Sequence, residues 1–146
     1  VEERLLFAQK LGVKHVVNPV QTDAVEEIRA ITGGRMSEVV VEASGNAAAI
    51  RSSIDYVSYA GRIALVGWPK SETSLPTALF TKKELDIVGS RNSFHAFPES
   101  ISLISEHKVD VEAVISKTIS FGEVPAFVKN IADNPGNYLK VIALLS

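Results

Sequence analysis

The stretch EVVVEASGNAAAIRSSIDYVSYAGRIALVGWP, residues 38–69, decides the fold. Residues 38–43 form an apolar run rich in β-branched side chains and without polar alternation, which is typical of a strand buried on both faces. Small and polar residues interrupt the run, a helical pattern follows, and residues 62–67 form a second apolar run. A strand, a crossover helix and a second strand make a right-handed βαβ unit, so we expect a parallel sheet.

The helix inside this stretch has a start signal, an apolar stripe and a stop signal. Asn46 is a suitable N-cap because its side chain can accept a hydrogen bond from the first helical turn. Ile50, Ile54 and Val57 follow at i, i+4 and i+7, which places them on one buried face. Gly61 is the expected C-terminal stop.

Composition restricts the class of protein. Of the 146 residues, 46% are apolar and 22% are charged, which is ordinary for a globular domain. The net charge of -2 gives no electrostatic case for binding nucleic acid or an anionic membrane. No apolar run approaches the roughly 18 residues of a membrane span, and no secretion signal is visible, so we expect a cytoplasmic protein. Without cysteine, the chain has no disulfide, thiolate metal ligand or thiolate nucleophile.

The first third of the chain continues the α/β pattern. The opening residues, VEERLLFAQKLG, lack a methionine and lie within an amphipathic helical pattern that Gly12 ends. Because a domain rarely begins on a helix with nothing before it, we expect the chain to be part of a longer protein. HVVN, residues 15–18, is predicted to be a short strand. Thr22 or Asp23 is predicted to cap the next helix, which ends at Gly33.

The remainder contains further strands and helices. We expect Leu75–Phe80 to be a short edge strand or an irregular segment, and residues 84–90 to be a strand. Pro98 is suited to the first turn of a helix that ends near His107. Beyond residue 109 the chain no longer follows the doubly wound alternation of strands and helices. The expected elements are an extended segment at 113–121, a helix at 123–133 and a last strand at 138–146. The first two thirds are therefore α/β, and the last third resembles part of another layer or domain.

Three loops could form a ligand crevice, because ligands bind at the carboxyl ends of strands in open parallel sheets. They are ASGN at residues 43–46, GWPKS at 67–71 and SRNS at 90–93. Gly45 and Gly67 would let a ligand approach the backbone closely. Alternatively, these glycines only end strands. The glycine-rich GxGxxG turn of dinucleotide sites is absent, and ITGGRMS is a helix C-cap instead.

The sequence contains no catalytic or metal-binding constellation of its own. None of the three histidines has a second histidine, a cysteine or a carboxylate at metal-ligand spacing. Asp110 and Glu112 are better explained by a solvated turn. No serine lies in a nucleophile-elbow context. Lys140, within the apolar last segment, is either an edge residue or a partner for a phosphate group.

The order of the motifs resembles the C-terminal part of medium-chain dehydrogenases of the zinc alcohol, sorbitol and threonine dehydrogenase type. The motifs are RLLFAQKLGVKHVVNP, VVVEASGN, GRIALVGWP, KKELDIVGSRNS, FPESISLISEHKVDVEAVISKTISF and YLKVIALL. The resemblance implies a truncated Rossmann-like, doubly wound parallel sheet without its first βα unit at residues 1–108. Residues 109–146 would be a C-terminal segment of the catalytic domain. The family's glycine-rich turn, its ribose-binding acid and its zinc ligands would all lie upstream of Val1.

The resemblance also implies a set of cofactor contacts, most of them made by the backbone. Two basic residues would reach the adenosine ribose and the pyrophosphate, namely Arg4 and Lys140. The loop that passes the adenine side would comprise Ala43, Ser44 and Gly45. Contacts to the nicotinamide carboxamide would come from Val66 and Trp68, with Gly67 between them, and from Ser90 and Asn92.

The implied function is hydride transfer from an alcohol or polyol to NAD or NADP, with zinc in the intact enzyme. This chain would supply part of the cofactor crevice and would be inactive alone, and it would form a homodimer through Leu75–Phe80. A second hypothesis is a folded, non-catalytic remnant or dimerisation module. A third is another Rossmann-like nucleotide binder, such as a methyltransferase, with Glu42 as the ribose-binding acid.

Overall fold

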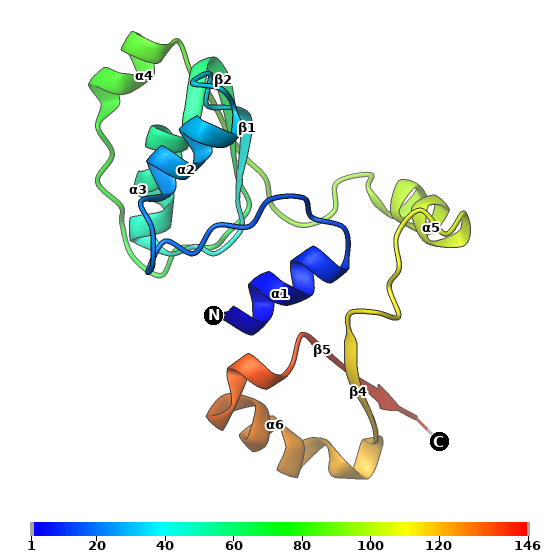
Figure 1. Ribbon diagram of the computed structural model, residues 1–146. Helices are drawn as coiled ribbons and strands as arrows, with labels where there is room; N and C mark the ends of the chain where they lie inside the picture. Colours follow the sequence, from blue (N-terminus) through cyan, green and yellow to red (C-terminus); the bar gives the residue numbers. More distant parts are fainter. Residues whose placement is uncertain (1, 146) are drawn as a thin grey trace. The chain divides into compact units, whose positions relative to one another are not determined.

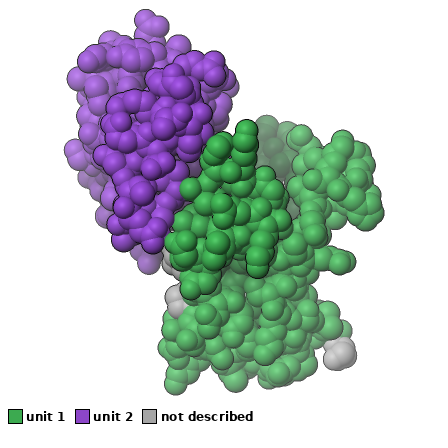
Figure 2. Space-filling model, viewed as in Figure 1, with its two compact units in different colours: residues 1–16, 93–146 green, residues 17–92 purple. Residues whose placement is uncertain are grey.

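The computed structural model describes residues 2–145 and contains two compact units (Figure 2). Unit 2 comprises residues 17–92, and unit 1 comprises residues 1–16 and 93–146. The predicted boundary between residues 108 and 109 concerns the domains of an intact enzyme and stays a prediction. No helix in the described part of the chain has the length and apolar character needed to cross a membrane.

Unit 2 contains the predicted βαβ unit and extends it by one strand (Figure 1). Its elements are α2 (Ala24–Ile31), β1 (Ser37–Glu42), α3 (Ala47–Tyr56), β2 (Val57–Leu65), α4 (Thr77–Lys83) and β3 (Asp86–Gly89). The strands form one sheet in the order β1-β2-β3, and both pairings are parallel. The α/β fold with a parallel sheet is thus confirmed.

The core of unit 2 lies between α3 and the sheet. Ile54, Val57 and Ile63 are almost completely buried, and Ile50 is 5% exposed. All three residues of the predicted stripe are thus buried, but only Ile50 and Ile54 lie on the helix, because Val57 is the first residue of β2. Partly buried side chains pack around this cluster: Val40, Leu65, Leu75, Leu79, Phe80, Leu85 and Ile87.

Both predicted helix starts in unit 2 are confirmed by side-chain capping. The Asn46 side-chain oxygen accepts hydrogen bonds from the amides of residues 48 and 49, at 2.9 and 3.2 Å. For the second helix, the alternatives were Thr22 and Asp23, and Asp23 is the cap. Its carboxylate accepts from the amides of residues 25 and 26.

The predicted stop at Gly61 is wrong. Helix α3 ends at Tyr56, and strand β2 begins with the next residue and contains Gly61. The register between β1 and β2 shifts between Val57 and Arg62 of β2, and Ala60 in this stretch has a left-handed φ of 51°. A Cβ atom on Gly61 would lie 2.6 Å from a Val57 methyl group. The glycine is thus explained by a tight irregularity in the strand, where the chain passes close to itself.

The predicted edge strand or irregular segment at Leu75–Phe80 is also wrong, because most of it belongs to helix α4. Leu79 of α4 and Leu75, which lies just before the helix, both pack against the core. At the other end of the helix, the Lys83 ammonium group donates to the carbonyls of Ile54 and Val57, at 2.7 and 2.9 Å. These tertiary contacts favour a helix that covers the core.

Residues 15–18 do not form the predicted strand. The Asn18 side chain accepts a hydrogen bond from the Val20 amide at 3.1 Å, and the Asn18 carbonyl accepts from the Gln21 amide at 3.0 Å. Pro19 lies inside this turn and has no amide hydrogen to give to a sheet. The segment therefore turns instead of pairing.

Strand β1 is buried on one face only, contrary to the prediction. Val40 packs on the core and Glu42 is buried, whereas Val39 and Val41 are 60% and 62% exposed. Alternate side chains of a strand point to opposite faces. Within unit 2, the second face of β1 is therefore uncovered among the described residues, although its composition is that of a strand buried on both faces.

Unit 1 contains the opening helix and the C-terminal third of the chain. Its elements are α1 (Glu2–Lys10), α5 (Phe97–Ser105), β4 (Ile115–Ser120), η1 (Phe121–Glu123), α6 (Val124–Asp133), η2 (Pro135–Asn137) and β5 (Lys140–Leu144). Strands β4 and β5 pair in parallel, with α6 as the crossover between them (Figure 1). Gly12, with φ of 92°, follows the end of α1. The expected extended segment, helix and last strand are confirmed.

Candidate functional site

The carboxyl ends of β1, β2 and β3 lie at one edge of the unit 2 sheet, because all three strands are parallel. The loops that leave these ends are tied to one another by backbone hydrogen bonds. The Glu42 carbonyl accepts from the amides of Val66 and Gly67, at 2.8 and 2.9 Å. The Leu65 carbonyl accepts from the Ser90 amide at 2.9 Å. The three predicted crevice loops therefore form one connected edge.

Two glycines allow the first two loops to touch. Gly45 has φ of 67°, and a Cβ atom there would lie 2.5 Å from the Trp68 carbonyl oxygen. A Cβ atom on Gly67 would overlap the Gly45 backbone and lie 2.6 Å from a Glu42 carboxylate oxygen. The sequence predicted close approach of a ligand at these glycines. In the structure, the space beside them is occupied by the neighbouring loop.

Glu42 is the buried acid of this edge, at 5% exposure. Its Oε1 atom accepts from the Ser44 amide at 2.8 Å and from the Ser44 hydroxyl at 2.5 Å. The Gly45 amide donates to both carboxylate oxygens, at 3.1 and 3.2 Å. Burial acts to raise the pKa of Glu42, but these hydrogen bonds outweigh it and hold the pKa below its ordinary value.

From the sequence, the one role assigned to Glu42 was that of a ribose-binding acid in a methyltransferase-like protein. The structure shows a different environment, because both carboxylate oxygens accept hydrogen bonds from the following loop and the side chain is buried. The sequence did contain a signal for this role of Glu42: an acidic residue ends an otherwise apolar strand and directly precedes a loop of small residues. Such a carboxylate can bond to its own loop as readily as to a ligand.

Two open pockets meet at Trp68. The first has a volume of about 380 Å³ and is lined by Ser44, Gly45, Asn46, Ala47, Trp68, Lys70 and Ser71. The second, of about 230 Å³, is lined by Val66, Trp68, Ser90, Arg91 and Asn92. Neither lining includes a carboxylate among the described residues. The Trp68 indole is 72% exposed, and the Arg91 guanidinium carbon lies 3.9 Å from the centre of its ring.

Most of the predicted site residues come together here. Six of them line the two pockets: Ser44, Gly45, Val66, Trp68, Ser90 and Asn92. Ala43 and Gly67 are adjacent in the same loops. Sequence reasoning missed Lys70 and Arg91, although each lies within or beside a quoted loop motif. The cofactor contacts assigned to all these residues stay predictions.

The two predicted basic residues belong to unit 1. The Arg4 guanidinium donates to the Tyr138 carbonyl at 2.6 Å and so links α1 to the approach to β5. Lys140 is the exposed first residue of β5. Their predicted contacts with ribose and pyrophosphate stay predictions.

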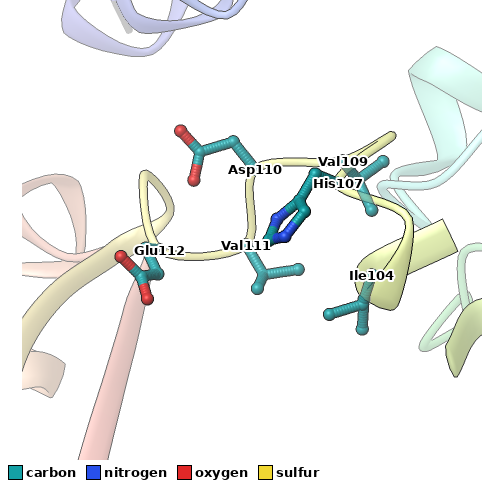
Figure 3. A pocket seen from close by; sticks show the side chains of 6 residues that line it. All are labelled: Ile104, His107, Val109, Asp110, Val111 and Glu112. Atoms are coloured by element: carbon teal, nitrogen blue, oxygen red, sulfur yellow. The ribbon is translucent and has the colours of Figure 1, made fainter.

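A third pocket, of about 340 Å³, lies in unit 1 (Figure 3). It is lined by Ile104, His107, Val109, Asp110, Val111 and Glu112, and all six residues are exposed. The Asp110 carboxylate accepts from the Ala113 amide at 3.0 Å, which fits the predicted solvated turn. Within residues 2–145 there is no group of three or more histidine and acidic side chains placed to hold a metal ion.

Comparison with known proteins identifies the family. Residues 1–106 match the family described as zinc-binding dehydrogenase. The chain belongs to this family. The resemblance to zinc-type medium-chain dehydrogenases is therefore confirmed, and the methyltransferase hypothesis is not retained.

Relatives agree with this assignment along almost the whole chain. An "uncharacterized zinc-type alcohol dehydrogenase-like protein" of Haemophilus influenzae is 48% identical, over 99% of this chain and 42% of its own length. Sorbitol dehydrogenase of Bacillus subtilis is 30% identical, over 95% of this chain and 40% of its own. A solved NAD-dependent alcohol dehydrogenase superposes with a TM-score of 0.83 at 26% identity, over 100% of this chain and 42% of its own. The chain thus spans about two fifths of the length of these three proteins.

Proposed function

We propose that this chain forms one part of the nicotinamide-dinucleotide crevice of an NAD- or NADP-dependent alcohol or polyol dehydrogenase. The observation that carries the proposal is the pair of pockets that share Trp68 at the carboxyl edge of the parallel sheet. Ligands of open α/β sheets bind at this edge. Family membership and the similarity to sorbitol and alcohol dehydrogenases support the same reaction class.

The chemistry of the pockets suits a dinucleotide. Their linings offer hydroxyl and amide groups from Ser44, Ser90 and Asn92, together with the cations Lys70 and Arg91. A dinucleotide carries ribose hydroxyls, a carboxamide and an anionic pyrophosphate, which such groups can bind. The exposed Trp68 indole adds an apolar surface between the two pockets. Arg4 and Lys140 are proposed as further cofactor contacts in the intact enzyme.

The bound cofactor would accept the hydride, and the residues of this chain would bind and orient it. Within residues 2–145, no histidine and acidic side chains are grouped so that they could hold a zinc ion. In the proposal, other parts of the intact enzyme hold the zinc and the small alcohol substrate. The isolated chain is then expected to bind NAD(H) weakly and to lack turnover.

The proposed enzyme is a cytoplasmic homodimer in which the Leu75–Phe80 region takes part in the contact. Because this region is largely helix α4, the contact would involve a helix and not the edge strand expected from the sequence. The net charge of -2 supports neither a nucleic-acid partner nor a membrane partner.

Fluorescence offers a direct test, because Trp68 is the single tryptophan of the chain and lines both pockets. NADH is titrated into the chain, and energy transfer from the indole to the reduced nicotinamide is recorded. We expect a saturable signal that NAD competes away, with cofactor-dependent stabilisation in a thermal melt. Absence of both effects would favour the non-catalytic module. Zinc-dependent turnover of alcohols by the isolated chain would contradict the proposal that other parts of the intact enzyme hold the zinc and the substrate.

A further inference from the structure

We propose that Glu42 is a positioning residue, which sets the arrangement of the two loops around Trp68 and thereby shapes the cofactor crevice. The inference rests on the proposed function for its consequence, namely cofactor binding. Its structural part, the connection of two loops through one buried residue, is independent of the ligand.

One residue joins both loops. The Glu42 carboxylate accepts from the Ser44 amide and hydroxyl and from the Gly45 amide, and so holds the first loop. Its backbone carbonyl accepts from the amides of Val66 and Gly67, and so holds the second. A shift of Glu42 would therefore move both pocket walls.

A carboxylate fits this set of donors better than a neutral amide side chain does. Both of its oxygens accept, and all three groups that face it are donors. A glutamine amide presents one acceptor and one donor. In Glu42→Gln, an NH₂ group in place of Oε2 would face the Gly45 N–H, which would lose its 3.2 Å contact and keep only the 3.1 Å bond to Oε1. Hydrogen bonds to a charged group are also stronger than neutral ones.

The fit around the carboxylate leaves little room for adjustment. A Cβ atom on Gly67 would lie 2.6 Å from Oε2, so the second loop touches the carboxylate that holds the first. Ser44 also constrains the residues that follow it, because its hydroxyl oxygen accepts a hydrogen bond from the Asn46 amide at 3.1 Å. Asn46 is the N-cap of α3. The loop is thus constrained from the end of β1 to the start of the helix.

The same contacts restrict what the first loop can offer to a cofactor. The amides of Ser44 and Gly45 and the Ser44 hydroxyl hydrogen are directed to Glu42. These groups are occupied within the protein. Contacts of this loop with adenine are therefore expected to use carbonyl oxygens and van der Waals surface, not amide donors.

Glu42→Gln tests the structural part by amide NMR of the 146-residue chain without ligand. The matched control is Glu38→Gln, an exposed glutamate on the same strand. We expect large chemical-shift changes and faster hydrogen exchange at the amides of Ser44 and Gly45, and smaller changes at Gly67. The control should leave these amides unchanged. Unaltered Ser44 and Gly45 amides in a folded Glu42→Gln protein would overturn the proposal.

The functional part is tested by NADH affinity from Trp68 energy transfer. We expect Glu42→Gln to weaken binding by about tenfold, while the core amides of Val57 and Ile63 keep their protection from exchange. Loop changes without a change in affinity would overturn the positioning role. If the wild-type chain fails to bind NADH, the proposed function fails, and the amide data still decide whether Glu42 orders the loops.

A second variant covers the case in which Glu42→Gln does not fold. Ser44→Ala removes the hydroxyl donor and keeps the carboxylate and both backbone donors. We expect altered amide shifts at Gly45 and Asn46 and a smaller loss of NADH affinity than in Glu42→Gln. Wild-type shifts at both amides in Ser44→Ala would contradict the proposed constraint.

Discussion

Replacement of Gly67 by alanine tests whether the two crevice loops are in direct contact. The change adds one methyl group at a position without a left-handed φ, so alanine is compatible with the backbone conformation. The added Cβ atom would overlap the Gly45 backbone and approach a Glu42 carboxylate oxygen to 2.6 Å. Backbone atoms on one side and a buried carboxylate on the other cannot move independently of the sheet edge.

The expected loss follows from this overlap. Inserting a methyl group into a well-packed site costs about 1–3 kcal/mol, and the lack of a flexible neighbour places Gly67→Ala in the upper half of that range. The matched control is Gly89→Ala at the end of β3. Nothing lies within 4 Å of a Cβ atom there, and φ is again not left-handed. The control should change stability by less than about 0.5 kcal/mol.

Urea unfolding followed by Trp68 fluorescence measures both variants. The expected result is a lower midpoint for Gly67→Ala with an unchanged slope, together with weaker NADH energy transfer because the shared pocket wall moves. Equal midpoints for Gly67→Ala and Gly89→Ala would refute the loop contact on which the site description depends.

Three further predictions concern contacts that hold unit 2 together. Lys83→Met removes the donor to two carbonyls at the end of α3 and should cost about 1–3 kcal/mol in urea unfolding, whereas exposed Lys82→Met should be near neutral. Asn46→Ala removes the cap of α3 and should cost about 1 kcal/mol; no change in the midpoint would contradict the cap. The pKa of Glu42 is lower in the folded state than in the unfolded state, so its ionised carboxylate stabilises the fold. This contribution is complete above the ordinary glutamate pKa, about 4.3, and is lost as the pH falls through the lowered pKa of the folded state. Wild type should therefore lose more stability than Glu42→Gln on acidification below about pH 4.3, and parallel pH profiles would disprove this.

Much of the fold could be predicted because its signals are local. The apolar runs of β1 and β2 and the spacing of Ile50 and Ile54 in α3 encode a βαβ unit by their periods alone. The caps Asp23 and Asn46 act on amides only two or three residues away. The loops of the site follow from the same reasoning, since the ends of parallel strands share one edge of the sheet.

The elements that were predicted wrongly depend on partners far away in the sequence. Helix α4 is favoured by a core made of α3 and the sheet, and Lys83 reaches carbonyls 29 and 26 residues before it. Gly61 is typical of a helix stop until the register of β1 and β2 shows the irregularity that requires it. No local pattern contains these contacts.

By itself, the sequence determined the parallel βαβ unit, the helix caps and the three loops at the strand ends, because each follows from neighbouring residues. Only the tertiary structure decided how ASGN and GWP are joined. Glu42 bonds to the loop that follows it and, through its carbonyl, to a loop more than twenty residues further along. Gly45 and Gly67 are small because those loops touch. Such a contact forms only when the sheet brings the two strand ends side by side.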